Sequence, residues 1–402
     1  MNIICHIFRD SKIDLWDLSS RVRYQRMLSR LGSVTVLDDP SDLPAQNSVL
    51  LLRGDFLYDE RVFSFLLKQA NVVLKIPFEK GALPVAAHVD GSLAYLTLLG
   101  MEQKTLPDLS QLRSVTLDEL SLSFSNELRK SDCPYVFPIR KDNQLALEDH
   151  LFTGSYKGVT DCVTKFLWPG SAKWATKFCA RYGISPNQVT TTSLILVMIV
   201  IGLFSSGYFA LGLLLGWVMT FLDTVDGKLA RVTVTSSKWG NIFDHGIDLI
   251  HPPLWYIAWG WGLKAFSPFI SSLSLEMTFG LILVGYIVGR IIEGVFQWFL
   301  AGFVIFCWRP FDSFFRLIAA RRNPNLIFLT ASVLIGRPDL GLEAVAVWTV
   351  FCTVILLGRL LGAIWIKASG GSLKSWLAKV DIANERDSLA VRLFTNPPAI
   401  VK

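Results

Sequence analysis

The chain has 402 residues, of which 51% are hydrophobic, 12% aromatic and 18% charged, with a formal net charge of +6. About a quarter of the residues in an ordinary soluble protein are charged, so this composition favours a membrane protein. Lysine and arginine form no dense stripe, which argues against nucleic-acid binding and in favour of contacts with anionic lipid headgroups. Residues 186–368 hold long runs nearly free of charge, which predicts a soluble domain followed by an integral membrane domain.

The first part of the chain, residues 1–145, alternates strand-like and helix-like segments. Apolar residues recur at helical spacing in residues 18–31 and 59–70. Runs rich in Val, Ile and Leu predict strands at residues 2–8, 33–39, 48–53, 71–76 and 135–139. This alternation predicts an α/β domain with a parallel sheet that is covered on both faces.

The order of these elements, with LLLRGDFLYDERVFSFLL in the middle, resembles the sugar-nucleotidyltransferase family. The resemblance implies a metal-holding role for Asp55, which follows a strand as the family's aspartate does. The family opens with a glycine-rich loop after its first strand, whereas the corresponding segment here, IFRDSKIDLWDLS, contains no glycine. Because side chains keep the backbone away from nucleotide phosphates, we interpret residues 1–145 as a degenerate, non-catalytic relative.

Residues 146–185 connect the two parts of the chain. Lysines alternate there with aromatic residues, as in Lys173, Trp174, Lys177 and Phe178, and Pro169 interrupts the segment. This pattern predicts an amphipathic helix that lies in the membrane interface. A linker helix packed on the soluble domain is the alternative.

Six apolar segments follow, and a membrane-spanning helix needs about 20 such residues. They are residues 188–206, 208–230, 240–262, 275–298, 323–337 and 341–366. With residues 1–185 inside, the connection after the fourth segment carries four positive charges, Arg309, Arg316, Arg321 and Arg322. Cytoplasmic loops carry an excess of Lys and Arg, so the sequence predicts that both termini, including a tail of residues 369–402, are cytoplasmic.

Four aspartates interrupt this apolar region. Asp223 and Asp226 are three residues apart, and Asp244 and Asp248 are four apart, so each pair shares one face of a helix. On two antiparallel neighbouring helices the pairs can converge. Carboxylates at membrane depth repel one another unless cations bind them, and oxygen ligands suit Mg²⁺, Mn²⁺ or Ca²⁺. In the alternative interpretation, the aspartates cap helix ends and pair with the nearby lysine and arginine.

The complete pattern is D-x2-D-G-x2-A-R-x8-G-x3-D-x3-D. It resembles the signature of the CDP-alcohol phosphotransferase (CDP-alcohol phosphatidyltransferase) family, which consists of integral membrane enzymes with six helices. In that family a hydroxyl group of an acceptor attacks the β-phosphate of a CDP-alcohol, and CMP leaves. The resemblance implies two divalent ions, Mg²⁺ or Mn²⁺, and a homodimer. It implies that Asp248 is the base and that the metal ligands are Asp223, Asp226, Asp244 and Asp248. It also implies that CDP is bound by Asp223, Gly227, Ala230, Arg231 and Gly240.

A nucleotidyltransferase-like domain ahead of such a membrane domain resembles the bifunctional enzymes of inositol-phosphate transfer. Lys157, Asp161 and Lys165 match the junction between the domains of those enzymes. The expected acceptor is an inositol phosphate, a glycerol phosphate or a lipid alcohol, with Lys157, Lys165 and Arg290 as candidate binding residues. For Arg290, a buried pair with Glu293 is an equal alternative. For the four arginines of the inner connection, topology and headgroup contact are favoured over substrate binding.

Two other classes of function compete with the enzyme. A cation-binding transporter is expected to place acidic residues near the middle of several spans, whereas these aspartates cluster at one end, with an arginine and two glycines. A non-catalytic membrane scaffold is expected to lose its aspartates first, whereas all four are present. The sequence therefore favours a membrane-embedded transferase.

Overall fold

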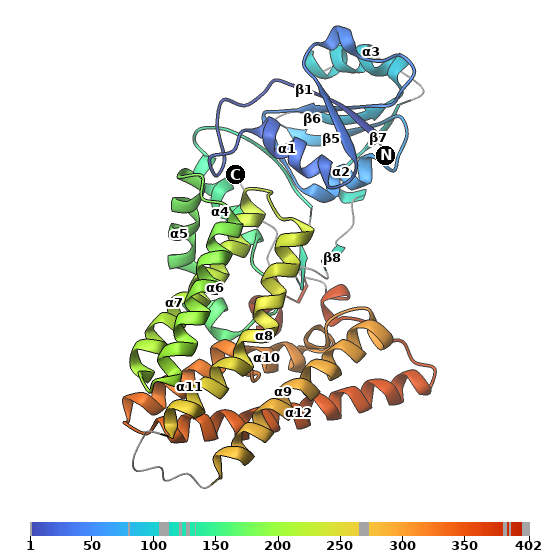
Figure 1. The fold of residues 1–402 in the computed structure, drawn as a ribbon. Helices are drawn as coiled ribbons and strands as arrows, with labels where there is room; N and C mark the ends of the chain where they lie inside the picture. The colour runs from blue at the N-terminus through green and yellow to red at the C-terminus, as the bar shows by residue number, and fades with distance from the viewer. Residues whose placement is uncertain are drawn as a thin grey trace.

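The computed structural model describes residues 2–78, 81–103, 112–119, 123–125, 129–132, 134–264, 273–380, 384–385 and 387–395. An α/β region formed by the first part of the chain stands on one end of a bundle of long helices formed by the rest (Figure 1). The predicted combination of an α/β region and a helical region is confirmed.

The main sheet of the α/β region has six strands in the order β2-β1-β3-β6-β5-β7. Their bounds are β1 Asn2–Phe8, β2 Ser33–Leu37, β3 Val49–Arg53, β5 Val72–Phe78, β6 Gly81–Val89 and β7 Arg113–Val115. β1 runs parallel to β2 and β3, but β6 runs antiparallel to both β3 and β5. The prediction of an all-parallel sheet is therefore wrong. Only two residues separate β5 from β6, and so short a connection joins antiparallel strands but cannot cross over between parallel ones.

Helices cover both faces of this sheet, as predicted. α1 (Ser20–Ser29) and α2 (Glu60–Leu66) pack on the face that carries Leu50 and Leu52, while α3 (Gly91–Glu102) packs on the face of Leu51. Successive residues of a strand point to opposite faces, and all five residues of β3 are buried, as expected for a central strand covered twice. Two small sheets pair β4 (Phe56–Tyr58) with β10 (Val136–Pro138), and β8 (Ser123–Ser125) with β9 (Lys130–Asp132). All five predicted strands and both predicted helices of this region are confirmed.

The connecting segment consists of α4 (Gln144–Gly154), a π-helical turn at Val163–Leu167, and α5 (Pro169–Arg181). Pro169 marks the predicted break because it opens a helix, where its missing N–H is not needed. Lys177 donates to Glu148 on α4 at 2.9 Å, and Lys173 pairs with Asp149. Trp174 and Phe178 remain exposed on α5. The lysines therefore fix α5 to α4, while the aromatic side chains are exposed, and the position of this segment in the membrane interface stays a prediction.

All six helices predicted in the membrane region are present. They are α6 (Pro186–Ser205), α7 (Phe209–Val232), α8 (Lys238–Leu263), α9 (Leu275–Val295), α11 (Arg322–Leu334) and α12 (Pro338–Ala368). In the part of the chain that the structure describes, four helices are long and apolar enough to cross a membrane: α6, α7, α9 with the turn that extends it to Ala301, and α12. α11 has only 13 residues, and α8 carries the charges of Lys238, Asp244 and Asp248. Integral membrane character is thus confirmed, and the number of six spans is not.

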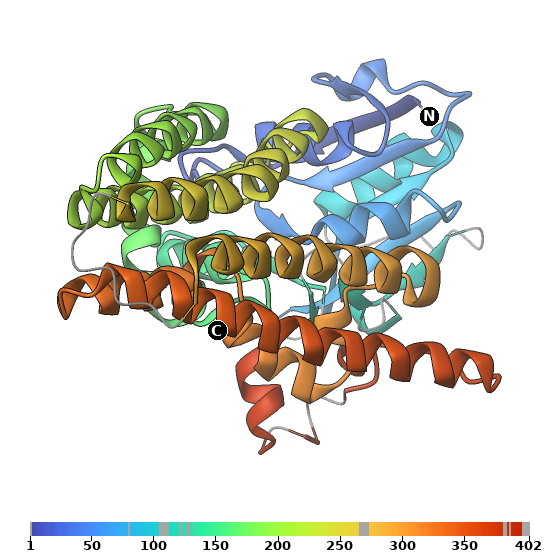
Figure 2. The same cartoon turned by 60° about the horizontal axis from the view of Figure 1, so that its bottom comes forward.

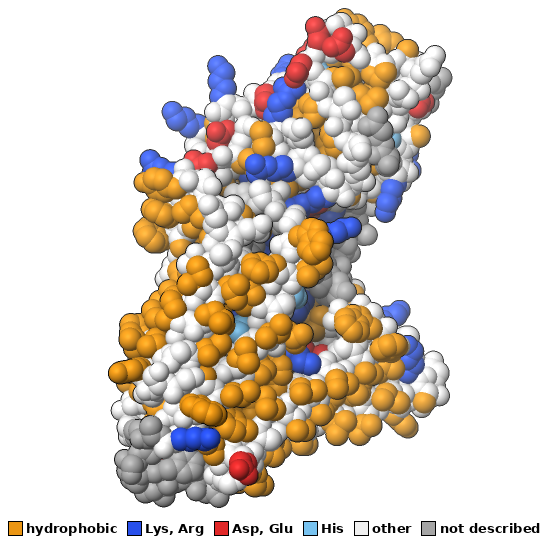
Figure 3. Space-filling view, viewed as in Figure 1, with side chains coloured by type: hydrophobic (Ala, Val, Ile, Leu, Met, Phe, Trp, Pro, Cys, Tyr) orange, Lys and Arg blue, Asp and Glu red, His pale blue; other side chains and the backbone are white. Residues whose placement is uncertain are grey.

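The surface of the molecule agrees with this division. Apolar side chains spread over the long helices, whereas charged side chains gather on the α/β region and in the recess where the two parts meet (Figure 3).

α12, the longest helix, lies along α9 and crosses the bundle (Figure 2). α6 begins with a capping box between Ser185 and Gln188, and Pro186 occupies its first turn.

α8 contains two consecutive prolines, Pro252 and Pro253. Proline has no N–H group, so the carbonyl groups of Asp248 and Leu249 receive no intrahelical hydrogen bond from the residue four positions ahead. The hydroxyl group of Tyr286 on α9 donates to the Leu249 carbonyl at 2.8 Å. One turn of α8 is therefore held from outside the helix, directly after Asp248.

The segment predicted as a cytoplasmic tail packs against the bundle over its described residues. α10 (Pro310–Ile318) and α13 (Leu389–Phe394) share an apolar cluster with Leu377, which is fully buried. Ser375 donates to the Cys307 carbonyl at 2.8 Å, and Trp376 donates to Ser313 at 2.9 Å. The described residues from 373 to 380 and from 387 to 394 are therefore part of the folded structure.

Candidate metal and active site

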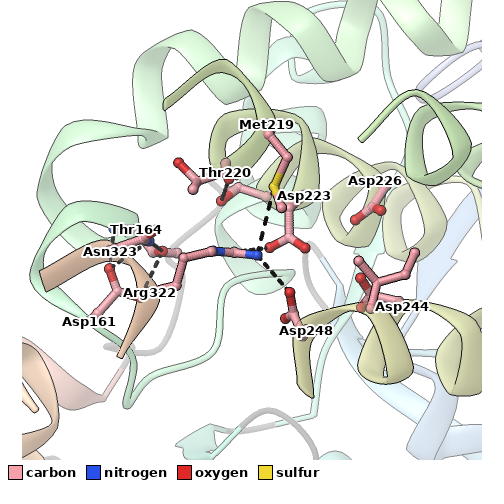
Figure 4. A network of polar contacts seen from close by, with 12 residues as sticks. Asp161, Thr164, Met219, Thr220, Asp223, Asp226, Asp244, Asp248, Arg322 and Asn323 are labelled. Carbon is pink, nitrogen blue, oxygen red and sulfur yellow. Dashed lines mark hydrogen bonds and ion pairs between the residues drawn. The ribbon is translucent and has the colours of Figure 1, made fainter. Parts of the chain in front are cut away.

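Three of the four signature aspartates come together. One carboxylate oxygen each from Asp223, Asp244 and Asp248 lies within 4.8 Å of the other two. Asp223 projects from the C-terminal part of α7 and the other two from the first half of α8, so the two antiparallel helices bring together residues 25 positions apart (Figure 4). The expected convergence of carboxylates from two adjoining helices is present in the structure.

Asp226 stands beside this trio and is not part of it. Its side chain is buried, and its Oδ2 atom accepts a hydrogen bond from the Thr190 hydroxyl of α6 at 2.5 Å. Its Oδ1 atom is also buried and accepts no hydrogen bond from any residue that the structure describes. A buried carboxylate oxygen without a partner carries a high desolvation cost, which a bound cation removes.

The donor set of this site fits divalent cations. Carboxylate oxygens are hard ligands, of the type that Mg²⁺ and Mn²⁺ prefer. The trio supplies three of them close together, and Asp226 adds an oxygen that has no hydrogen-bond partner among the described residues. The residues that would hold the ions are therefore the four aspartates of the signature.

Arg322 occupies a position between the two helices that the sequence did not reveal. It is the first residue of α11, and its guanidinium group donates to Asp223 at 2.5 Å and to Asp248 at 2.6 Å (Figure 4). The side chain is only 13% exposed. One positive charge therefore joins a carboxylate of α7 to a carboxylate of α8. Sequence reasoning assigned Arg322 to topology, and only its place at the start of an apolar segment hinted at more.

The small residues of the signature keep space beside these carboxylates. A Cβ atom on Gly227 would lie 3.0 Å from the Arg231 guanidinium group. A Cβ atom on Gly240 would lie 3.0 Å from the Ser237 hydroxyl and 3.2 Å from the Asn187 side chain. Larger residues at these two positions would thus displace polar groups that line the same cavity as the aspartates.

A cavity of about 1780 Å³ contains the whole arrangement. It is lined by the four aspartates, by all the predicted CDP-binding residues, and by two of the three candidate acceptor residues, Lys157 and Arg290. Lys165 is not among the lining residues. Its ammonium group donates to the Gly158 carbonyl at 3.0 Å and lies 5.2 Å from the centre of the Phe394 ring. Lys165 is therefore held by the connecting segment and by α13 and does not line the cavity.

Several cations line the opposite wall of the cavity. Arg290 lies 3.5 Å from Glu293, as one alternative expected, but it also reaches the cavity. Arg321 pairs with the same carboxylate. The buried Nε and Nη1 atoms of Arg316 have no hydrogen-bond partner among the described residues. An anionic group can bind here because it would supply the missing acceptor.

Asp161 fixes the start of α11 next to this wall. Its carboxylate accepts hydrogen bonds from the Thr164 backbone at 3.0 Å and from Asn323 at 3.0 Å. Burial raises the pKa of Asp161, but the Arg316 charge and these hydrogen bonds together lower it by more. The pKa of Asp161 is therefore below its usual range. Because Asn323 follows Arg322, this carboxylate helps to set the position of the bridging arginine.

The α/β region carries no comparable site at the position that its family resemblance implied. The Asp55 carboxylate accepts two hydrogen bonds from Arg53, at 2.9 and 2.6 Å, and so already has a positively charged partner. A Cβ atom on Gly54 would lie 2.7 Å from the Asp10 backbone, which shows how closely the neighbouring loop packs. Asp55 is therefore an ion-pair partner of Arg53, and the non-catalytic interpretation of this region stays a prediction.

Parts of this chain are similar to known proteins. Residues 183–319 match the family model described as CDP-alcohol phosphatidyltransferase. Choline/ethanolaminephosphotransferase 2 of Arabidopsis thaliana is 51% identical over 53 residues, which cover 13% of this chain and 13% of that protein. Two solved structures of phosphatidylinositol phosphate synthase from Mycobacterium tuberculosis are similar to 48% of this chain. The complex with manganese and citrate is 22% identical, with 91% of its chain covered and a TM-score of 0.37. The form with CDP-DAG bound is 21% identical, with 96% covered and a TM-score of 0.36.

Proposed function

We propose that this protein is a membrane-embedded CDP-alcohol phosphotransferase, because residues 183–319 match the model of the CDP-alcohol phosphatidyltransferase family. It moves the substituted phosphate group of a CDP-alcohol onto the hydroxyl group of an acceptor and releases CMP. The observation that carries the proposal is the trio of Asp223, Asp244 and Asp248 within 4.8 Å, in one cavity with the signature glycines and Arg231.

Different residues of the cavity have different roles in this reaction. The hydroxyl oxygen of the acceptor forms a bond to the β-phosphorus, its proton passes to Asp248, and the bond from that phosphorus to the bridging oxygen breaks. CMP leaves with the electron pair. Divalent cations, when bound, supply the charge that neutralises the leaving phosphate. Asp248 suits the role of base because its side chain is 43% exposed and faces the cavity. Gly227, Ala230, Arg231 and Gly240 form the wall for CDP.

The acceptor in this proposal carries an anionic group, such as the phosphate of an inositol phosphate or a glycerol phosphate. Lys157, Arg290 and Arg316 line the cavity and hold positive charge close to the carboxylates. The unsatisfied nitrogens of Arg316 favour such a group over a neutral lipid alcohol. Residues 1–145 do not make the donor in this scheme, because Asp55 is paired and the first loop has no glycine.

For the domain bounds, the topology, the oligomeric state and the number of ions, the proposal keeps the predictions made from the sequence. The proposed transferase unit is residues 186–368, preceded by a connecting segment of residues 146–185 and followed by residues 369–402. Both termini are placed in the cytoplasm, and the protein is expected to be a homodimer surrounded by lipid. Two divalent ions, Mg²⁺ or Mn²⁺, are expected at the aspartates.

Release of CMP tests the proposal directly. The full-length protein in detergent, incubated with a CDP-alcohol and the candidate acceptors, should release CMP with Mn²⁺ or Mg²⁺, and lose at least about 99% of that activity in EDTA, since cations at such sites stabilise several kcal/mol of charge. A scaffold would release none under any condition, and a transporter would instead carry Mn²⁺ into vesicles. Either of these two results would contradict the proposal.

The state of Lys157 predicts how anion binding depends on pH. Burial lowers the pKa of Lys157 to about 8, with further lowering by Arg129 and Arg231 against the opposing charges of Asp244 and Asp248. The lysine is therefore charged below that pH and neutral above it. Affinity for inorganic phosphate, measured by calorimetry in EDTA, should fall by about tenfold between pH 7.5 and 9.5, which corresponds to the loss of one charged contact.

Two lysine variants control this measurement. Lys157→Met should bind phosphate weakly at both pH values. Burial also lowers the pKa of Lys165 to about 8, but Lys165 lies outside the cavity, so Lys165→Met should keep the pH dependence. If phosphate binding by the wild-type protein does not change between these pH values, Lys157 does not contact the anion.

A further inference from the structure

The loop after β1, residues 9–19, buries three of its side chains, those of Leu15, Trp16 and Leu18. Trp16 from this loop is 1% exposed and belongs to an apolar cluster with Val225, Leu229 and Val232 of α7. Its indole N–H donates to the Glu148 carbonyl at 3.0 Å, and its backbone N–H donates to the Glu148 side chain at 3.2 Å. The place of a phosphate-binding loop is thus filled by a contact between protein segments.

The backbone of this loop is held in a conformation that these residues rarely adopt. Trp16 has φ 58° and Asp17 has φ 53°, both in the left-handed region. Such a conformation carries a cost for residues other than glycine and persists only where the surroundings fix it. Here the apolar cluster and the two hydrogen bonds to Glu148 fix it.

Two arginines of α1 bind the end of the signature helix. Arg23 is 1% exposed and donates to the carbonyl groups of Val232, at 2.9 Å, and Leu15, at 2.8 Å. Arg26 donates to the Thr233 carbonyl at 2.7 Å. The last carbonyls of a helix have no intrahelical partner and carry partial negative charge, so the arginines satisfy both needs.

The segment that follows is inserted into the α/β region. Val234 has φ 56°, is 5% exposed, and packs in the same cluster as Tyr24 and Met27 of α1. Only residues 233–237 separate α7 from α8. The connection between the two helices that carry the aspartates is therefore anchored in the core of the other domain.

The contacts lie on the side of α7 that faces away from the chemistry. Val225, Leu229 and Val232 follow one another at helical spacing, and Asp223 and Gly227 lie on the opposite side of the same helix. Because a helix is rigid, contacts that fix one side of α7 also fix the position of the residues on its opposite side. Arg231 lies next to the residue whose carbonyl Arg23 binds.

We propose that the α/β domain is a clamp on the C-terminal end of α7, and that Trp16 and Arg23 are positioning residues for the CDP-binding wall and the aspartates. The positioning role in this inference rests on the proposed transferase function, whereas the contacts that form the clamp do not depend on it.

Hydrogen–deuterium exchange on the full-length protein in detergent tests the clamp without any substrate. In Arg23→Gln, amide exchange of residues 226–240 should become at least about tenfold faster, because buried carbonyls lose their donors. Peptides from α9 and α12 should exchange as in the wild type. Arg23→Lys, which keeps the charge and one donor, should restore part of the protection. Arg21→Gln is the matched control, since Arg21 lies on the same helix and pairs with the exposed Asp38.

Binding of CDP in the presence of Mn²⁺ provides the second measurement. Arg23→Gln should weaken CDP about tenfold, consistent with misplacement of Arg231 and the aspartates. If Arg23→Gln does not fold, Arg26→Gln, which removes one partly buried hydrogen bond, carries the same comparison. Unchanged exchange of residues 226–240 in the folded variant would overturn the clamp. Failure of the wild-type protein to bind CDP would overturn the proposed function instead and leave the exchange result to decide the clamp.

Discussion

Replacement of Asp248 by asparagine is expected to lower the rate of CMP release by about 10²–10⁴-fold, the usual contribution of a general base. The amide keeps an oxygen that can bind a cation but cannot take the proton of the acceptor. Asp223 and Asp244 remain as the other members of the trio. Binding of CDP with Mn²⁺, measured by calorimetry, should therefore change far less than turnover.

His245→Gln is the matched control for this variant. His245 lies on the same helix, its side chain is 62% exposed, and its ring contacts the Asn241 carbonyl of its own helix. It should keep the wild-type rate. Turnover near the normal level in Asp248→Asn would show that another group accepts the proton.

Removal of the bridging arginine should produce the largest change in stability. Arg322→Gln leaves the carboxylates of Asp223 and Asp248 facing each other without their shared cation. Breaking a buried ion pair by removing one partner costs about 3–5 kcal/mol. Thermal unfolding in detergent with EDTA should show this loss as a much lower Tm.

The same variant should respond strongly to metal. With the guanidinium group gone, Mn²⁺ becomes the main neutralising charge at the trio, so added Mn²⁺ should raise the Tm of Arg322→Gln more than that of the wild type. Arg309→Gln is the control, because Arg309 is exposed in the connection that precedes the same helix. An unaltered Tm of the metal-free variant would mean that the bridge contributes nothing to stability.

The positions of the helices could be predicted because their signals are local. The apolar runs, the Ser185–Pro186 start of α6 and the spacing of the aspartates all lie within short segments of sequence. The convergence of α7 and α8 followed from the short connection between them, which requires neighbouring antiparallel helices. The signature was therefore enough to locate three of the four carboxylates correctly.

What the sequence concealed depends on contacts between distant segments. The bridge from Arg322 to Asp223 joins residues 99 positions apart, and the contact from Arg23 to Val232 joins residues 209 apart. The antiparallel direction of β6 was missed because no strand was predicted there. The surroundings of Lys165 could not be predicted because its neighbour Phe394 comes from the far end of the chain.

The proline pair of α8 gives the carboxylate cluster a pivot. The ligand atoms of the trio lie within 4.8 Å of one another, so a divalent ion, which bonds to oxygen at about 2.0–2.6 Å, would need only small shifts of the two helices to reach all three. The turn after Asp248 lacks two of the backbone hydrogen bonds of an ordinary helix. The half of α8 that bears Asp244 and Asp248 can therefore tilt at this turn without breaking a backbone hydrogen bond there. Bending of α8 at this one turn can thus accommodate the binding of an ion and the release of product. The apolar half of the same helix stays packed against its neighbours.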